Sequence, residues 1–259
     1  MSTRVRLVDG ISNAKFVALS HRWGPKTKKV SLTKANFTEF REEVPQSSLY
    51  QLFRDAITLT GKIGLRYIWI DCLCIMQGDS QDDINDWSTQ AGNMTAIYAG
   101  AFLTISGTGC VDADEGLFQN SPVAADTMMV AKIKPYSIYF RPMIRHPRYF
   151  SRGSRPEFEQ SVYPLTGRGW VYQERALSKR IVHFTQEEVI WECMKNFQCQ
   201  CGHNTRPGII KDFLQTSWKD IIATYSHMDL TTQTDRLPAI AGVAKAYAER
   251  HSLKYLAGL

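Results

Sequence analysis

The sequence predicts an α/β fold in which a mostly parallel β-sheet is flanked by helices. Three short apolar runs, at residues 16–20, 67–75 and 102–106, are rich in branched and aromatic side chains. Such runs are typical of strands that are buried on both faces. Helical patterns separate them, and this alternation of strands and helices favours a parallel sheet with helices on its faces.

Two helices are expected between the first and second strands. The first strand leads into the polar turn 21–25 and then into a lysine-rich loop. The helical patterns that follow cover about 32–44 and 47–62. Pro45 separates them, because proline breaks a helix interior.

A third helix is expected at about 81–98, between the second and third strands. Ser80 or Asp79 can cap it by accepting a hydrogen bond from its first turn. An apolar stripe at spacings of three and four indicates its inward face. The stripe consists of Ile84, Trp87, Ala91, Met94 and Tyr98. Gln90 borders this stripe and brings an amide group to the inward face.

The second half of the chain has a weaker pattern. Short strands are expected near 133–140, followed by a short helix and two strands within 167–193 that meet at a tight turn at 186–187. A final amphipathic helix is expected at 235–250, with Asp235 as its cap.

These patterns divide the chain into two parts. Residues 1–193 form one domain, with a core at about 14–110 and a β-rich extension at about 111–193. Residues 194–259 are expected to form a helical extension that packs on the core. The stretch 128–156 carries seven Lys or Arg residues and no acid. It can be a basic lip over a phosphate site, a solvated face or a partner surface.

Composition excludes several classes of protein. The 259 residues are 44% hydrophobic, which suffices for a core, and no apolar run is long enough to span a bilayer. The first ten residues lack a secretory signal, and six cysteines in such a chain indicate reduced thiols in a cytoplasmic protein. The net charge of +6 fits an anionic ligand without requiring nucleic acid, and we expect neither nucleic acid nor membrane as a partner.

Polar residues follow the first strand at its carboxyl end, where parallel sheets bind ligands. Ser20, His21 and Arg22 are the first candidates. Arg22 can pair with a pyrophosphate, and Trp23 can stack on a base or ribose. An equally good interpretation of Arg22 is a salt bridge to Asp71, which interrupts the second apolar run.

Further candidates follow the second strand and lie in the expected third helix. Cys74 and Gln77 face the same edge. Cys74 is interpreted as an apolar filler rather than a nucleophile, because no histidine adjoins it. Gln90 is either a structural amide or a site residue, and Trp87 lies beside it on the helix.

A third polar and aromatic cluster consists of Trp170, Gln173, Glu174 and Arg175. Glu174 and Arg175 are expected to form a structural ion pair. Glu174 is the alternative acid if position 90 has no role.

Three cysteines and one histidine, which are residue types that bind zinc, lie close together in the second half of the chain. Cys193, Cys199, Cys201 and His203 give the pattern C-x5-C-x-C-x-H, which is not a standard zinc motif. The sequence therefore predicts no metal site.

Three blocks together resemble the fungal HET (heterokaryon incompatibility) domain. They are FVALSHRWG at 16–24, YIWIDCLCIMQGD with the following DW, M and IYAGAFLTI at 67–105, and RGWVYQERALSKRIVHFT at 168–185. The segments DRLPAIAGVA and YLAGL resemble the segment that follows the domain in such proteins, which implies that the extension at 194–259 is truncated. The resemblance implies a role in non-self recognition and regulated cell death. It also implies remote kinship to TIR domains and thus a TIR- or flavodoxin-like core.

Some TIR domains cleave NAD at the nicotinamide–ribose bond with a glutamate that follows a Trp on the helix after the second strand. HET-like proteins commonly carry this glutamate three residues after the Trp, where this chain has Gln90. The resemblance implies that Gln90 replaces a catalytic glutamate and that this chain is therefore inactive. It also implies that NAD is the substrate and that no cofactor is required.

Two classes of function remain open on the sequence. One is an NAD glycohydrolase that kills by depleting NAD. The other is a non-enzymatic death-signalling module that acts by homotypic assembly and recruits a partner. Either class implies a homo-oligomer, by analogy with TIR-like proteins, and an upstream incompatibility receptor.

Overall fold

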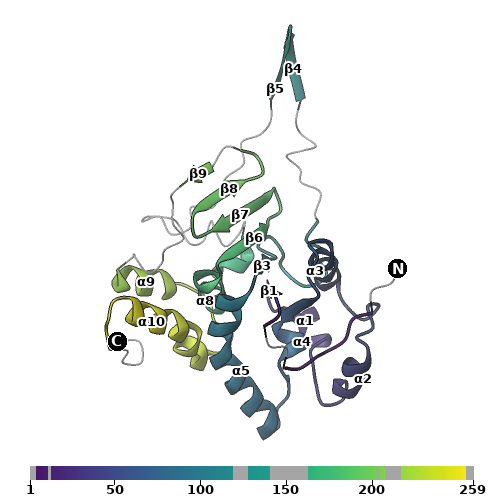
Figure 1. Cartoon of the computed structure of the whole chain (residues 1–259), viewed down its shortest axis with the longest axis vertical. Helices are drawn as coiled ribbons and strands as arrows, with labels where there is room; N and C mark the ends of the chain where they lie inside the picture. Colours follow the sequence, from purple (N-terminus) through teal and green to yellow (C-terminus); the bar gives the residue numbers. More distant parts are fainter. Residues whose placement is uncertain are drawn as a thin grey trace.

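A computed structural model describes residues 4–10, 13–118, 128–140, 163–202, 205–207 and 217–254. It confirms the predicted α/β class with a mostly parallel sheet and flanking helices (Figure 1). No helix in these ranges is long and apolar enough to cross a membrane.

The main sheet has seven strands in the order β2-β1-β3-β6-β7-β8-β9. Its first four strands are parallel: β2 (Tyr67–Ile70), β1 (Phe16–Ser20), β3 (Leu103–Ser106) and β6 (Arg180–Phe184). Three antiparallel strands extend it: β7 (Val189–Cys193), β8 (Asn196–Cys199) and β9 (Thr205–Pro207). The predicted turn at 186–187 joins β6 to β7.

The predicted strand at 67–75 is wrong in its second half. β2 ends at Ile70, and a short helix, α4 (Asp71–Cys74), follows at once. The carboxylate of Asp71 accepts a hydrogen bond from the backbone N–H of Cys72 at 2.6 Å, and the N–H of Ile75 donates to the carbonyl of Asp71. An acidic residue in the first turn favours a helix, so Asp71 turns the chain away from the sheet.

The helices before β2 also differ from the prediction. Three are present: α1 (Pro25–Lys29), α2 (Phe37–Glu42) and α3 (Gln51–Lys62). α1 falls in the stretch predicted as a loop, because Pro25 at its first position is compatible with a helix start even in a lysine-rich segment.

The long helix α5 (Gln81–Gly100) confirms the prediction for this segment. Ser80 caps it, and Asp83 completes a capping box by accepting from the N–H of Ser80. Met94 and Tyr98 are buried on its inward face, whereas Ile84 at its beginning is exposed. The stripe is therefore exposed at its first residue, partly buried at Trp87, and buried at Met94 and Tyr98.

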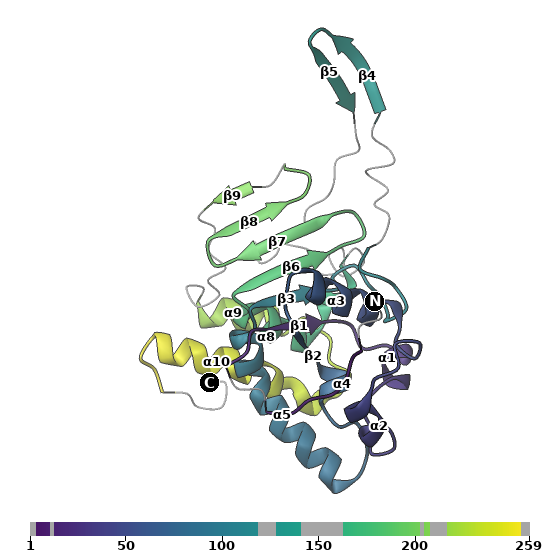
Figure 2. The same ribbon diagram turned by 45° about the vertical axis from the view of Figure 1, so that its right-hand side comes forward.

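The remaining helices gather on one side of α5. They are η1 (Pro164–Gly167), α8 (Gly169–Leu177), α9 (Trp218–Tyr225), η3 (Gln233–Arg236) and α10 (Pro238–Arg250). α10 packs against α8 and α5, and α8 packs against α5 (Figures 1 and 2). Asp235 does not cap α10 as predicted; it lies in η3, where it accepts a hydrogen bond from Trp170.

The hairpin of β4 (Met128–Ile133) and β5 (Tyr136–Phe140) stands apart from the main sheet in both views (Figure 2). Its side chains are almost all exposed, including Tyr136 at 72%. The rest of the basic stretch 128–156 lies outside the described residues.

Candidate functional site

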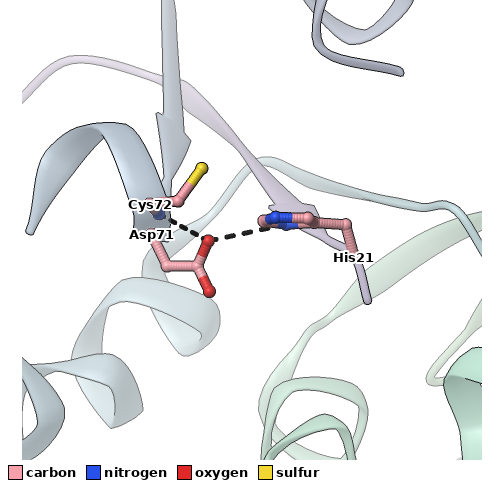
Figure 3. Close-up of side chains that lie close together, drawn as sticks. All are labelled: His21, Asp71 and Cys72. Atoms are coloured by element: carbon pink, nitrogen blue, oxygen red, sulfur yellow. Dashed lines mark hydrogen bonds and ion pairs between the residues drawn. The ribbon is translucent and has the colours of Figure 1, made fainter. Parts of the chain in front are cut away.

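The parallel pairing of β1 with β2 brings the ends of both strands to the same edge of the sheet. Ser20 ends β1 and His21 follows it, while Asp71 directly follows β2. Three of the residues predicted from the sequence are therefore neighbours in space, and Figure 3 shows the carboxylate of Asp71 directed at the ring of His21.

Asp71 organises this edge through three contacts. Its Oδ2 accepts a hydrogen bond of 2.6 Å from the indole N–H of Trp23, and its Oδ1 accepts from the N–H of Cys72. The same Oδ1 lies 3.5 Å from Nδ1 of His21. The proposed salt bridge between Arg22 and Asp71 is absent from the ion pairs of the described residues, so the guanidinium of Arg22 is not tied to this carboxylate.

His21 is buried and imperfectly satisfied. Its ring stacks on Trp23 and meets Phe53 edge-on, with centroids 6.4 and 5.2 Å away. Neither ring nitrogen has a partner with hydrogen-bond geometry in the described part of the chain. Burial lowers the pKa of His21 and nearby Arg168 adds to this, while Asp71 opposes it. His21 is therefore a neutral imidazole at neutral pH, and it can bind a ligand atom.

Glu174 of α8 reaches the same edge from the helix packed beside it. Burial raises the pKa of Glu174 to about 8, against the opposing effect of the nearby hydroxyls of Ser20 and Tyr98. Its Oε2 has no hydrogen-bond partner among the described residues. Since the carboxyl is largely protonated at neutral pH, it can donate a proton, as a general acid must.

Two guanidinium groups lie at this edge. Burial lowers the pKa of Arg168, and the nearby charge of Arg22 lowers it further. Two cations that repel each other in a partly buried place favour the binding of an anion between them. Arg168 immediately precedes α8, whose N-terminal end also favours negative charge.

Arg168 and Tyr98 were not among the residues predicted for the site. The signal for Arg168 was its place in the block RGWVYQER, two positions before Trp170. Tyr98 looked like an ordinary member of the apolar stripe. Its hydroxyl donates to the carbonyl of Leu19 in β1, and no periodicity can show this contact.

Gln90 contacts a different residue from those of this cluster. It is half-buried on α5, and its amide donates to Asp86 Oδ1 at 3.4 Å. Asp86 in turn accepts from the N–H of Met76, just beyond α4. The neighbouring Trp87 meets Trp170 of α8 edge-on at 6.2 Å. This turn of α5 is therefore connected to both the α4 loop and the start of α8.

Other predicted residues have structural partners. The amide of Gln77 donates to the carbonyl of Ile75, and Gln173, which is buried, accepts from the N–H of Gly242 in α10 at 2.7 Å. Burial raises the pKa of Cys74 to about 11, so it is a thiol rather than a thiolate nucleophile.

Among the described residues, Arg175 pairs with Glu192 and not with Glu174, so the predicted ion pair is wrong. Arg175 makes two hydrogen bonds to Glu192 of β7, at 2.8 and 2.9 Å. The reason is helical geometry: consecutive residues on a helix point in different directions, so Glu174 and Arg175 enter different surroundings.

Two groups of side chains in the described part of the chain could hold a metal ion. One is His21, Asp71 and Cys72 at the edge just described. The other is Glu188, Cys199 and Cys201 at the beginning of β7 and the end of β8. His203, which the sequence grouped with these cysteines, lies outside the described residues.

The fold and this edge define an α/β protein with a buried polar cluster where parallel sheets bind ligands. The model of the heterokaryon incompatibility protein (HET) family matches residues 16–174, which is more than half of the chain. The chain therefore belongs to the HET family, as the three sequence blocks indicated. Searches of curated proteins and of solved structures gave no match.

Proposed function

We propose that this chain is an incompatibility and cell-death module whose sheet edge binds NAD or a related nucleotide. The observation that carries the proposal is the cluster of His21, Asp71 and Glu174 at the carboxyl ends of β1 and β2. Within the described part of the chain, buried polar atoms of His21 and Glu174 have no hydrogen-bond partner. Buried polar atoms are normally satisfied, so orphaned ones at such an edge point to a ligand.

The charges around the edge suit a dinucleotide. Arg22 and Arg168 supply two cations for a pyrophosphate, and Arg22 is free of Asp71. Trp23 offers an aromatic face whose N–H is held by Asp71. A base or ribose can stack there while the phosphates meet the guanidinium groups.

The reaction we assign to the active form is hydrolysis of the nicotinamide–ribose bond. Water replaces nicotinamide at the ribose carbon, and positive charge grows on the ribose as nicotinamide leaves. A carboxylate near that charge stabilises the transition state. Position 90 is where the family resemblance places this carboxylate. Gln90 has nearly the shape of a glutamate side chain but lacks its negative charge.

Gln90 therefore explains why this chain would be slow. Loss of one electrostatic contribution of this kind typically lowers the rate by about 10²–10³. Gln90→Glu should restore the charge at the turn of α5 that Trp87 links to α8. Nicotinamide release from NAD, followed by chromatography, measures the effect.

Gln81→Glu is the matched control. Gln81 lies on the same helix, is exposed, and hydrogen-bonds within its own face to Asn85. Turnover should rise at least about 10²-fold in Gln90→Glu and stay at the wild-type level in Gln81→Glu. Equal turnover of the Gln90→Glu variant and the wild type would refute the catalytic assignment of position 90.

The second candidate function is a signalling module without chemistry, which recruits a partner after homotypic assembly. The observation that favours it is the hydrogen bond of Gln90 to Asp86, which occupies the amide within its own helix. In this case wild type and Gln90→Glu should be equally toxic on expression in a heterologous host. The glycohydrolase instead predicts toxicity for the glutamate form alone.

A further inference from the structure

The end of the β7–β8 hairpin brings two thiols and a carboxylate together, far along the sheet from the His21 edge. Glu188 immediately precedes β7, Cys199 ends β8, and Cys201 lies in the turn that follows. The sulfur atoms of Cys199 and Cys201 are 3.1 Å apart. The potential ligand atoms of all three residues lie within 4.8 Å of one another.

The strand pairing imposes this proximity. Ile190 of β7 lies opposite Cys199 of β8, so the beginning of one strand faces the end of the other. The carboxylate of Glu188 accepts a hydrogen bond of 2.9 Å from the N–H of Cys201. The N–H of Gln200 donates to the carbonyl of Val189, which fixes the intervening turn.

We propose that Glu188, Cys199 and Cys201 form a zinc-binding site. Thiolates and carboxylates are both established zinc ligands, and zinc accepts three protein ligands with water in the fourth position. Glu188 and Cys199 are buried, while Cys201 is half-buried and leaves a path for the ion. The third ligand comes from the neighbouring strand, which is why the spacing of the cysteines alone does not indicate zinc.

The distances require only a small adjustment. With a zinc–sulfur bond of about 2.3 Å and a tetrahedral angle, the two sulfur atoms should be about 3.8 Å apart. The present separation of 3.1 Å is longer than a disulfide bond and shorter than this value. Rotation of the half-buried side chain of Cys201 can open the pair.

Zinc would stabilise the antiparallel extension of the sheet, where β7, β8 and β9 lie beyond the parallel strands. Each thiol must lose its proton to bind, so affinity should fall as the pH falls. Binding should also raise the melting temperature, because a ligand that binds only the folded state stabilises it.

The test is zinc binding by the purified chain of 259 residues, measured by competition with a chromophoric chelator. Variants Cys199→Ser, Cys201→Ser and Glu188→Gln each remove one ligand. Cys193→Ser is the matched control, since Cys193 ends β7 at the opposite end of the strand from Glu188. Cobalt substitution provides a second readout, because thiolate ligands give cobalt a charge-transfer band.

We expect one zinc ion per chain in wild type and in Cys193→Ser. Each cysteine variant should lose more than the roughly 10- to 100-fold in affinity that removal of an outer-sphere partner costs. Circular dichroism of the apo variants shows whether they remain folded. If one of them unfolds, the proposal is tested by the cobalt charge-transfer band, which should appear in the wild type and in Cys193→Ser.

Two results would overturn the proposal. One is the absence of zinc binding by the wild type, or an affinity for zinc that is unchanged when both Cys199 and Cys201 are replaced. The other is a mass lower by two hydrogens that disappears on reduction and is absent in Cys199→Ser, because this would show a disulfide in place of the metal site.

Discussion

Helix α8 carries two neighbouring residues into two buried polar clusters that behave differently. Glu174 lies in the edge cluster with His21 and Asp71, where polar atoms of His21 and Glu174 have no hydrogen-bond partner among the described residues. Arg175 enters a second cluster with Glu192 and His183, which is closely hydrogen-bonded. The comparison sets a buried cluster that supports the fold beside one that we propose to bind a ligand.

The second cluster runs across three strands. Nε2 of His183 lies 2.9 Å from Glu192, and its Nδ1 lies 2.9 Å from the hydroxyl of Thr108. That hydroxyl in turn lies 2.8 Å from Ser106 at the end of β3. Each charged group thus has a partner of the appropriate kind, as buried polar groups need.

The edge cluster differs, because it contains buried polar atoms that have no hydrogen-bond partner among the described residues. Burial shifts the pKa values of its groups, and Glu174 is the clearest case, because burial raises its pKa to about 8. Perturbed groups of this kind gather at functional sites. Substitutions in the two clusters should therefore differ in their effects on stability.

Arg175→Met should destabilise the chain most. It leaves the carboxylate of Glu192 buried without its cation, and breaking a buried pair costs about 3–5 kcal/mol. Chemical denaturation measures the free energy of unfolding. Arg4→Met is the control: Arg4 and Glu43 are mostly exposed, so loss of their pair should cost less than about 1 kcal/mol. A cost for Arg175→Met as small as the control's would remove the structural role of the second cluster.

Glu174→Gln should flatten the dependence of stability on pH. The folded-state pKa of Glu174 is raised from 4.5 to about 8, so the folded chain holds a proton that the unfolded chain releases. Its contribution is complete below pH 4.5 and is lost as the pH rises towards 8, at no more than about 1.4 kcal/mol per pH unit. Denaturation at several pH values measures the slope.

The control for this experiment is Glu43→Gln, which changes an exposed carboxylate. It should keep the wild-type slope between pH 5 and 8, whereas Glu174→Gln should reduce it. An unchanged slope in Glu174→Gln would mean that its carboxyl is ionised in the folded chain at neutral pH.

Asp71→Asn should have the smallest effect on stability of the three. It weakens the two charge-assisted hydrogen bonds that Asp71 accepts, from Trp23 and from the N–H of Cys72, at a cost of about 1–2 kcal/mol. It should also lower the pKa of His21 further, since Asp71 is the first of the groups that raise it. Nuclear magnetic resonance of the His21 ring follows this titration. A pKa of His21 that rises in Asp71→Asn would contradict the described edge.

The sequence predicted the strands and the long helix of this fold well, because their hydrophobic patterns and caps are local. The prediction that the strand continues after Ile70 was wrong, because the mostly apolar pattern of 71–75 fits a buried helix turn as well as a strand. The sequence brought Ser20, His21 and Asp71 to one edge because parallel strands end together. It could not foresee that Glu192 would pair with Arg175, because that contact depends on which way α8 rotates against β7.

The most direct test of the account is binding of NAD to the edge cluster, measured by titration calorimetry. Wild type should bind NAD. Arg22→Ala should weaken binding at least about 10-fold, as expected from the loss of a hydrogen bond to a charged ligand. Arg4→Ala, which removes a guanidinium on the exposed surface, should bind as wild type does. No binding by wild type, or equal binding by Arg22→Ala, would contradict the claim that this edge is a nucleotide site.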